Sequence, residues 1–369
     1  MKKAYAIIGT IIAAVVFWIA TTQSSIEKEN KRCVYAVLPL TGPIAQLGKT
    51  IQGAMQMYLE EHPYSRIDVV FVDSASVPDK ALSALNAKTA SKDNIIVVSA
   101  LSSVSSALIP FVSNKHGFLF PILTVAITDG GNNNCYQRFS MGTRDIVDPI
   151  ATYARENYNT VSILYANEDY GLRNKDRFVQ VFSDSSKRGS LEQRILSQTS
   201  FDLQDKNVRE IVSRIVTDHP EAIYITGNGT ATYINLIKSI NEVGFKGKVL
   251  ADASFSNPFV YKALGNIAER VLFTCANSDL TYPQNKEAIE FRNYCQKHEI
   301  IPYGTTSNAY DVLGLIDLLL DKSENITAST ISEMAEYVGS DRVKFTGRGD
   351  CEYVCTLANV RGNEIIEAK

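Results

Sequence analysis

The sequence predicts an α/β protein made of two doubly wound lobes. Short apolar segments rich in β-branched residues alternate with amphipathic helical segments along most of the 369 residues. Buried parallel strands have this composition, and the alternation is typical of parallel sheets with helices on both faces. A chain of this length is too long for one ordinary core and suits two.

The first residues resemble a signal for export. Lys2 and Lys3 precede an apolar run at 4–20, and small polar residues follow it. A positive start, an apolar stretch and a polar exit describe a secretory signal peptide, but a run of about 17 residues is also near the lower limit for crossing a bilayer. We expect residues 1–25 to be a cleaved signal peptide or an N-terminal membrane anchor, and the remainder to be periplasmic or extracellular.

Two series of strands follow, separated by helices with apolar stripes. The first series is expected at 34–40, 67–73, 95–100 and 118–123, and the second at 161–166, 191–196, 222–226, 249–253 and 271–275. Apolar residues recur at helical spacing over 47–59, 208–216 and 233–243, and the last of these stops at Gly244, a residue suited to ending a helix. Each series predicts one doubly wound lobe.

The pattern in the last third of the chain predicts that the chain returns to lobe one and then crosses again to lobe two. Helical patterns at 283–298, 308–320 and 330–338 precede a strand at 343–346 and a strand and hairpin at 353–360 and 364–366. We expect crossings near 142–145, 275–279 and 346–350, which together form a multi-strand hinge. This division gives residues 32–144 plus 277–345 to lobe one, and 145–276 plus 346–369 to lobe two.

The composition limits the classes of partner that we expect this protein to bind. A formal net charge of −3 leaves no basic excess for nucleic acid or an anionic membrane, so membrane contact is expected only through the N-terminal segment. The six cysteines lack the paired spacing of a zinc site, and we expect neither a metal nor a cofactor. In an exported chain they predict structural disulfides or buried free thiols.

Residues 34–54, VYAVLPLTGPIAQLGKTIQGA, resemble the start of the leucine- and branched-chain amino-acid-binding proteins, a branch of the type I periplasmic binding proteins. NEDYG at 167–171 and NAYD at 308–311 extend the resemblance, which spans about 34–366. It implies two Rossmann-like lobes that close around a small, amino-acid-like ligand and deliver it to an ABC permease. The alternative that it implies is a membrane-tethered sensor of the same fold, reporting to a partner protein.

The first half of the ligand site is expected beyond the strand at 95–100. In open α/β sheets, ligands bind past the carboxyl ends of the strands. Serines at 102, 103, 105 and 106 open the next helix, where hydroxyls and free amides favour an anion. The resemblance implies a carboxylate at Ser102 and Ser103 and further contacts at Thr124 and Ala126, although relatives often carry a hydroxyl at the position of Ala126.

The second half of the site is expected in lobe two. The resemblance implies that Tyr170 lies over the ligand and that an acidic residue after a lobe-two strand pairs with its ammonium group. That acidic position aligns with Ala253, one residue after Asp252. Asp252 is therefore predicted either to serve as this partner after a shift of the loop, or to cap a helix or face solvent.

Catalysis is not expected. Gly227-Asn228-Gly229 follows a strand, but Thr232 replaces the third glycine of a dinucleotide-binding loop. A serine hydrolase of the G-x-S-x-G type is excluded because this motif does not occur.

Overall fold

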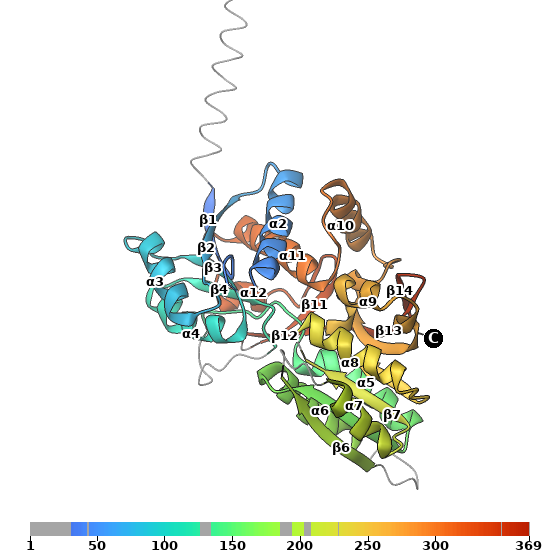
Figure 1. The fold of residues 1–369 in the computed structure, drawn as a ribbon. Helices are drawn as coiled ribbons and strands as arrows, with labels where there is room; N and C mark the ends of the chain where they lie inside the picture. Colours follow the sequence, from blue (N-terminus) through green and yellow to red (C-terminus); the bar gives the residue numbers. More distant parts are fainter. Residues whose placement is uncertain are drawn as a thin grey trace, which may run out of the picture.

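The computed structural model describes residues 31–42, 44–125, 134–184, 194–202, 208–227, 229–347 and 349–368. These residues form two α/β lobes, each built on a sheet with parallel strands, and the predicted fold class is confirmed (Figure 1). The predicted signal or anchor at 1–25 and Ala126 lie outside the described residues. No helix within those residues combines the length and apolar character needed to span a membrane.

Lobe one has a parallel sheet in the order β2-β1-β3-β4, whose strands are blue to teal in Figure 1. Its strands are β1 (Arg32–Leu38), β2 (Ile67–Asp73), β3 (Ile96–Ala100) and β4 (Phe118–Ile122). Helices α2 (Ala45–Glu61) and α11 (Gly304–Lys322) pack on one face, and α3 (Pro78–Thr89) and α4 (Ser102–Asn114) on the other. Helix α10 (Lys286–Lys297) packs against α2.

Lobe two has a seven-stranded sheet in the order β14-β13-β9-β8-β7-β5-β6. The parallel strands are β5 (Thr160–Ala166), β6 (Arg194–Phe201), β7 (Ala222–Thr226), β8 (Lys248–Ala251) and β9 (Val271–Ala276). The antiparallel hairpin β13 (Cys355–Arg361) and β14 (Glu364–Glu367) extends the sheet beside β9. Helices α5 (Thr143–Asn157) and α6 (Asp169–Phe182) cover one face, and α7 (Val208–Thr217), α8 (Thr230–Glu242) and α9 (Pro258–Leu264) the other.

A small antiparallel sheet packs on the lobe-one core, and one of its strands corrects a predicted helix. Its strands are β10 (Glu336–Val338), β11 (Arg342–Gly347) and β12 (Asp350–Tyr353). The helix predicted over 330–338 is wrong in its second half, since α12 (Ala328–Ser332) stops early and Tyr337 pairs with Val343. Pairing with β11 decides the conformation there, because strand formation depends more on tertiary neighbours than on local preference.

The chain passes between the two large sheets at three places. The first lies between β4 and α5 and the second follows β9, at the short helix η4 (Asn277–Asp279). The third is at Val354, between β12 and β13. Strand β12 belongs to the small sheet, whose buried side chains are part of the lobe-one core. Strand β13 belongs to the seven-stranded sheet. The strand predicted at 353–360 is therefore interrupted at Val354.

Cys33, Cys275, Cys295, Cys351 and Cys355 have free thiols, and three of these five match the predicted alternative of buried free thiols. Cys275, Cys295 and Cys351 are buried and Cys33, Cys135 and Cys355 are partly buried.

Candidate functional site

A cavity of about 960 Å³ lies between the lobes. The first turns of helices α2, α4 and α11 line it from lobe one, and those of α6, α8 and α9 line it from lobe two. Parallel strands place the following helices with their N-termini at one edge of each sheet, so both lobes present helix N-termini to the same space. Ser102, Ser103, Thr124 and Tyr170 all line the cavity, and the structure brings these four predicted site residues together.

The start of α4 offers backbone amides and hydroxyls to the cavity. Leu101 precedes the helix with φ of 77°, no side chain caps the first turn, and no acidic residue lies in it. The first intrahelical bond runs from the Ser105 amide to the Leu101 carbonyl, so the three earlier amides have no partner within the helix. Ser102, Ser103 and Ser106 line the cavity beside these amides, which favours an anion.

Ser105 differs from its three neighbours because it faces the protein interior. It is fully buried, and its hydroxyl lies 2.8 Å from Ser99 Oγ and 3.3 Å from Thr124 Oγ1. The expectation that all four serines converge on a ligand is therefore wrong for Ser105. Its role is to hold the end of β3 and the segment after β4 together.

Thr124 and Ser140 form a reciprocal contact at the back of the cavity. The Thr124 amide donates to Ser140 Oγ at 3.1 Å, and the same hydroxyl donates to the Thr124 carbonyl at 2.7 Å. Thr124 Oγ1 contacts the Ile122 carbonyl at 3.2 Å. Thr124 thus lines the cavity with a hydroxyl that already has partners, and it contributes chiefly to the shape of the cavity.

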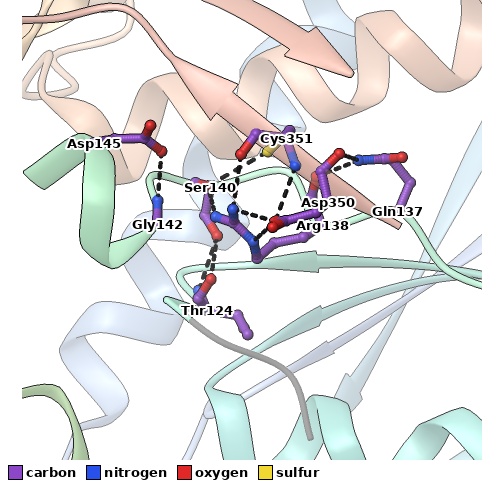
Figure 2. Close-up of polar contacts among 8 residues, drawn as sticks. All are labelled: Thr124, Gln137, Arg138, Ser140, Gly142, Asp145, Asp350 and Cys351. Carbon is purple, nitrogen blue, oxygen red and sulfur yellow. Dashed lines mark hydrogen bonds and ion pairs between the residues drawn. The ribbon is translucent and has the colours of Figure 1, made fainter. Parts of the chain in front are cut away.

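The same segment is tied to β12, as Figure 2 shows. Arg138 donates to the Ser140 carbonyl, to the Asp350 carboxylate and, at 2.8 Å, to the Cys351 carbonyl. Further along, the Gly142 amide donates to Asp145 Oδ2 at 2.7 Å at the start of α5. Burial raises the pKa of Asp145 to about 6. These bonds connect the cavity, the first crossing and the strand that precedes the third crossing.

The start of α6 positions Tyr170. Glu168 precedes the helix and its carboxylate accepts hydrogen bonds from the amides of Tyr170 at 2.9 Å and Gly171 at 3.0 Å. A Cβ on Gly171 would lie 2.2 Å from the Ala166 carbonyl oxygen, so only glycine permits this approach of α6 to β5. The Tyr170 hydroxyl accepts a hydrogen bond from Ser254 Oγ at 3.3 Å, and the ring lines the cavity.

Asp252 lies behind the lobe-two wall of the cavity and does not line it. It is fully buried, and its carboxylate accepts hydrogen bonds from Thr226 Oγ1 at 2.6 Å and from the amides of Gly227 at 3.0 Å and Ser254 at 2.9 Å. The Tyr233 hydroxyl lies 3.4 Å from its second oxygen. Burial raises the pKa of this carboxyl.

The prediction of direct ligand contact at Asp252 is therefore corrected to its capping alternative. Its side chain caps the short helix η2 (Ala253–Ser256) through the Ser254 amide, which directs the carboxylate into the lobe. Ala253 and Ser254 line the cavity instead. Three groups bonded to Asp252, those of Gly227, Tyr233 and Ser254, belong to lining residues, so Asp252 positions this wall.

Two helix starts in the cavity were not singled out from the sequence as binding elements. Helix α8 begins after Gly229, with φ of 94°, without a side-chain cap or an acidic residue in its first turn. Helix α11 begins at Gly304, whose amide donates to Asp279 Oδ1 at 2.8 Å. Burial raises the pKa of Asp279 to about 6. For α8, the glycines on both sides of position 228 were the sequence signal that a binding helix could begin there. For α11, the sequence held no such signal, because the partner of the Gly304 amide is Asp279, which is distant in the chain.

Comparison with known proteins agrees with this architecture. A family model described as a periplasmic binding protein matches residues 36–320. The structure is similar to the substrate-binding protein LivJ of Streptococcus pneumoniae in complex with isoleucine, with TM-score 0.76 and 15% identity over 92% of this chain and 100% of that one. No curated protein sequence matches the chain.

Two further solved structures share the fold. A solute-binding protein from Rhodopseudomonas palustris BisB5, in complex with 3,4-dihydroxybenzoic acid, has TM-score 0.75 and 17% identity over 92% of this chain and 96% of that one. An extracellular ligand binding receptor from Desulfohalobium retbaense has TM-score 0.72 and 18% identity over 92% of this chain, which spans 60% of that chain's length. With the family model matching most of its residues, the chain belongs to the periplasmic binding protein family.

Proposed function

We propose that this protein is an extracytoplasmic receptor that closes around a small carboxylate-bearing solute, an amino acid or a related compound, and delivers it to an ABC permease. The observation that carries the proposal is the cavity of about 960 Å³ whose walls come from both lobes. A cavity of this size suits a small molecule. The similar proteins solved in complex with isoleucine and with 3,4-dihydroxybenzoic acid support a carboxylate-bearing solute.

We assign the carboxylate to the start of α4. Its unpartnered amides and the hydroxyls of Ser102 and Ser103 present donors on one side of the cavity, and the helix N-terminus adds a partial positive charge. Tyr170 then contacts the body of the solute from lobe two, while Thr124 shapes the cavity behind it. Ala126, which lies outside the described residues, stays a predicted contact to the solute.

Closure is the proposed response to the solute. Residues 32–144 plus 277–353 form lobe one in this proposal, and 145–276 with the hairpin β13–β14 form lobe two. We place the third crossing at Val354, not at 346–350, because β12 belongs to the small sheet. Three crossings permit rotation of one lobe against the other, as hinge closure requires.

Delivery to a permease and sensing by a tethered receptor imply different fates for the N-terminal segment. The apolar run at 4–20 predicts either a signal that is removed or an anchor that holds the receptor at the membrane. Mass spectrometry of the protein recovered from an exporting cell distinguishes the two, because an anchored receptor retains residues 1–25. We favour delivery, since the similar solute-binding protein from Rhodopseudomonas palustris BisB5 is a component of an ABC transporter.

Titration of the full-length protein with a library of amino acids and organic acids tests the proposal. We expect saturable binding by calorimetry to at least one carboxylate, accompanied by a smaller radius of gyration in X-ray scattering. A folded protein that binds no member of the library and keeps the same scattering profile throughout contradicts a receptor function.

A further inference from the structure

Three charged side chains line the cavity among the residues that the structure describes. They are Glu168, Asp169 and Arg173, and all three lie at the start of α6. Arg173 Nε lies 2.9 Å from each carboxylate oxygen of Asp169, so these two residues form an ion pair. Their charges offset one another. The negative charge that remains at the described cavity wall therefore belongs to Glu168.

The carboxylate of Glu168 is held in place but is not neutralised. One oxygen accepts from the Tyr170 amide at 2.9 Å and the other from the Gly171 amide at 3.0 Å. A carboxylate has about four acceptor positions, so about two remain for a ligand. None of the ion pairs between described residues involves Glu168. Glu168 thus offers a positioned anion to a cationic group.

The acid that the resemblance suggested for an ammonium group does not line the cavity. Asp252 is fully buried behind the lobe-two wall, where four polar groups of the protein surround its carboxylate. Ala253 and Ser254 line the cavity at this loop, and neither carries a charge. Within the described part of lobe two, a cationic group of the solute would therefore be bound after β5, at Glu168, and not after β8.

Closure of the lobes makes a counter-charge for Glu168 necessary. The residue is partly buried, and closing the cavity around a solute removes more of the water that solvates its carboxylate. A carboxylate that loses its water without gaining a cation is destabilised. A solute carboxylate at the start of α4 would add a second negative charge to the same enclosed space. A cationic group on the solute offsets both effects, because it brings the missing positive charge into the cavity.

We propose that Glu168 binds the cationic group of the solute and selects a zwitterion, such as an amino acid, over a simple carboxylic acid. The inference rests on the proposed receptor function and names the residue that sets the solute class of the same cavity. The solute carboxylate is bound at the start of α4 in lobe one, and its ammonium group at the start of α6 in lobe two. The two charges of one solute thus hold the two lobes together.

Matched pairs of compounds test the proposal on the full-length protein by calorimetry. Each amino acid of the library is titrated beside the acid that lacks only its ammonium group, such as L-leucine beside isocaproate and L-phenylalanine beside hydrocinnamate. The pair whose amino acid or acid binds most tightly is then used for the variants. We expect the amino acid of that pair to bind at least about tenfold tighter than its acid, because only the amino acid compensates Glu168.

Glu168→Gln removes the charge and keeps the size of the side chain. We expect the preference for the amino acid to fall at least about tenfold in this variant, while the affinity for the matched acid stays the same or rises. Asp169→Asn is the control, because it removes the neighbouring charge, whose ion pair is largely exposed, and should keep the preference within about threefold. If Glu168→Gln does not fold, as judged by circular dichroism, Glu168→Ser repeats the comparison with a residue that favours the start of a helix.

The outcomes separate this inference from the receptor function. Acids that bind as tightly as their amino acids, or a preference that persists without the Glu168 charge, overturn the inference and leave a functioning receptor. A preference that falls equally in Asp169→Asn also overturns it, since the effect then belongs to the total charge at the start of α6. Silence toward every compound, with unchanged scattering, overturns the receptor function and this inference with it. A preference that is lost in Glu168→Gln and kept in Asp169→Asn supports both.

Discussion

In lobe one, the cavity is lined by the first turn of α4, whose amides and serine hydroxyls follow directly from the end of β3. In lobe two, it is lined by the first turns of three helices and by the loops after β7 and β8, which a buried carboxylate, Asp252, holds from behind. The donors at the start of α4 are part of the helix itself. The two lobe-two loops depend on a side chain that does not line the cavity, so we expect stability and binding to be coupled there and largely separate at α4.

Asp252→Ala should give the largest contrast between the lobes. Removing the carboxylate leaves the buried groups of Thr226, Gly227 and Ser254 without their acceptor, and each such group costs about 1 to 3 kcal/mol. We expect the free energy of unfolding to fall by roughly 3 to 5 kcal/mol in urea titrations. Asp252→Asn retains one acceptor oxygen and should lose less. Wild-type stability in Asp252→Ala would show that the lobe-two loops need no such support.

A second prediction compares Asp252 with Asp311, a buried acid of lobe one. Asp311 on α11 accepts from Ser340 Oγ at 2.7 Å, and burial together with Asp341 raises its pKa from 3.8 to about 7. A raised pKa means that the folded state binds the proton more tightly than the unfolded state. The stability contributed by this proton is present below about pH 4 and is lost as pH rises through 7.

The measurement is the free energy of unfolding between these two pH values. We expect a decrease of roughly 2 to 4 kcal/mol in the wild type and a smaller one in Asp311→Asn, which cannot ionise. Asp279 and Asp145, whose pKa values are raised to about 6, contribute in the same direction to both proteins. Identical pH profiles for the wild type and Asp311→Asn would remove Asp311 from this effect.

The smallest effects are expected from the residues that contact the solute. Ser103→Ala in lobe one removes one hydroxyl, and Tyr170→Ala in lobe two removes a ring that lines the cavity. We expect each to weaken binding of the preferred solute by at least about 1 kcal/mol in calorimetry. Ser103→Ala should leave the unfolding free energy within about 0.5 kcal/mol of the wild type, as surface substitutions usually do. Unchanged affinity in both variants would remove these residues from the site.

Most elements were predictable because their pattern is local. The strand at 67–73 and the strand at 222–226 agree with the prediction at both ends, and the helix stripe over 233–243 ends before Gly244, whose φ is 76°. The second half of the helix expected at 330–338 is a strand, because β10 pairs with β11. The residue pattern within 330–338 does not indicate that this segment will pair with the strand that follows the next turn.

The candidate site likewise contains residues whose position was predictable from the sequence and one whose orientation was not. Ser102, Ser103, Thr124 and Tyr170 follow strand ends, so their place at one edge of the sheets was predictable from order along the chain. Asp252 occupies an equivalent position but faces the interior, because its carboxylate accepts from groups 25 and 26 residues earlier in the chain. Spacing cannot distinguish a carboxylate that faces a cavity from one that supports the loop beside it.

The sequence by itself determined the two-lobed α/β fold and the strand ends at which a solute is expected, since both depend on periodicity and order along the chain. Only the tertiary structure decided which polar groups face the cavity, that Ser105 and Asp252 turn inward, and that β12 and β13 belong to different sheets. The physical reason is that side-chain direction at a strand end is selected by hydrogen-bond partners from distant segments, and those partners meet only when the sheets are assembled.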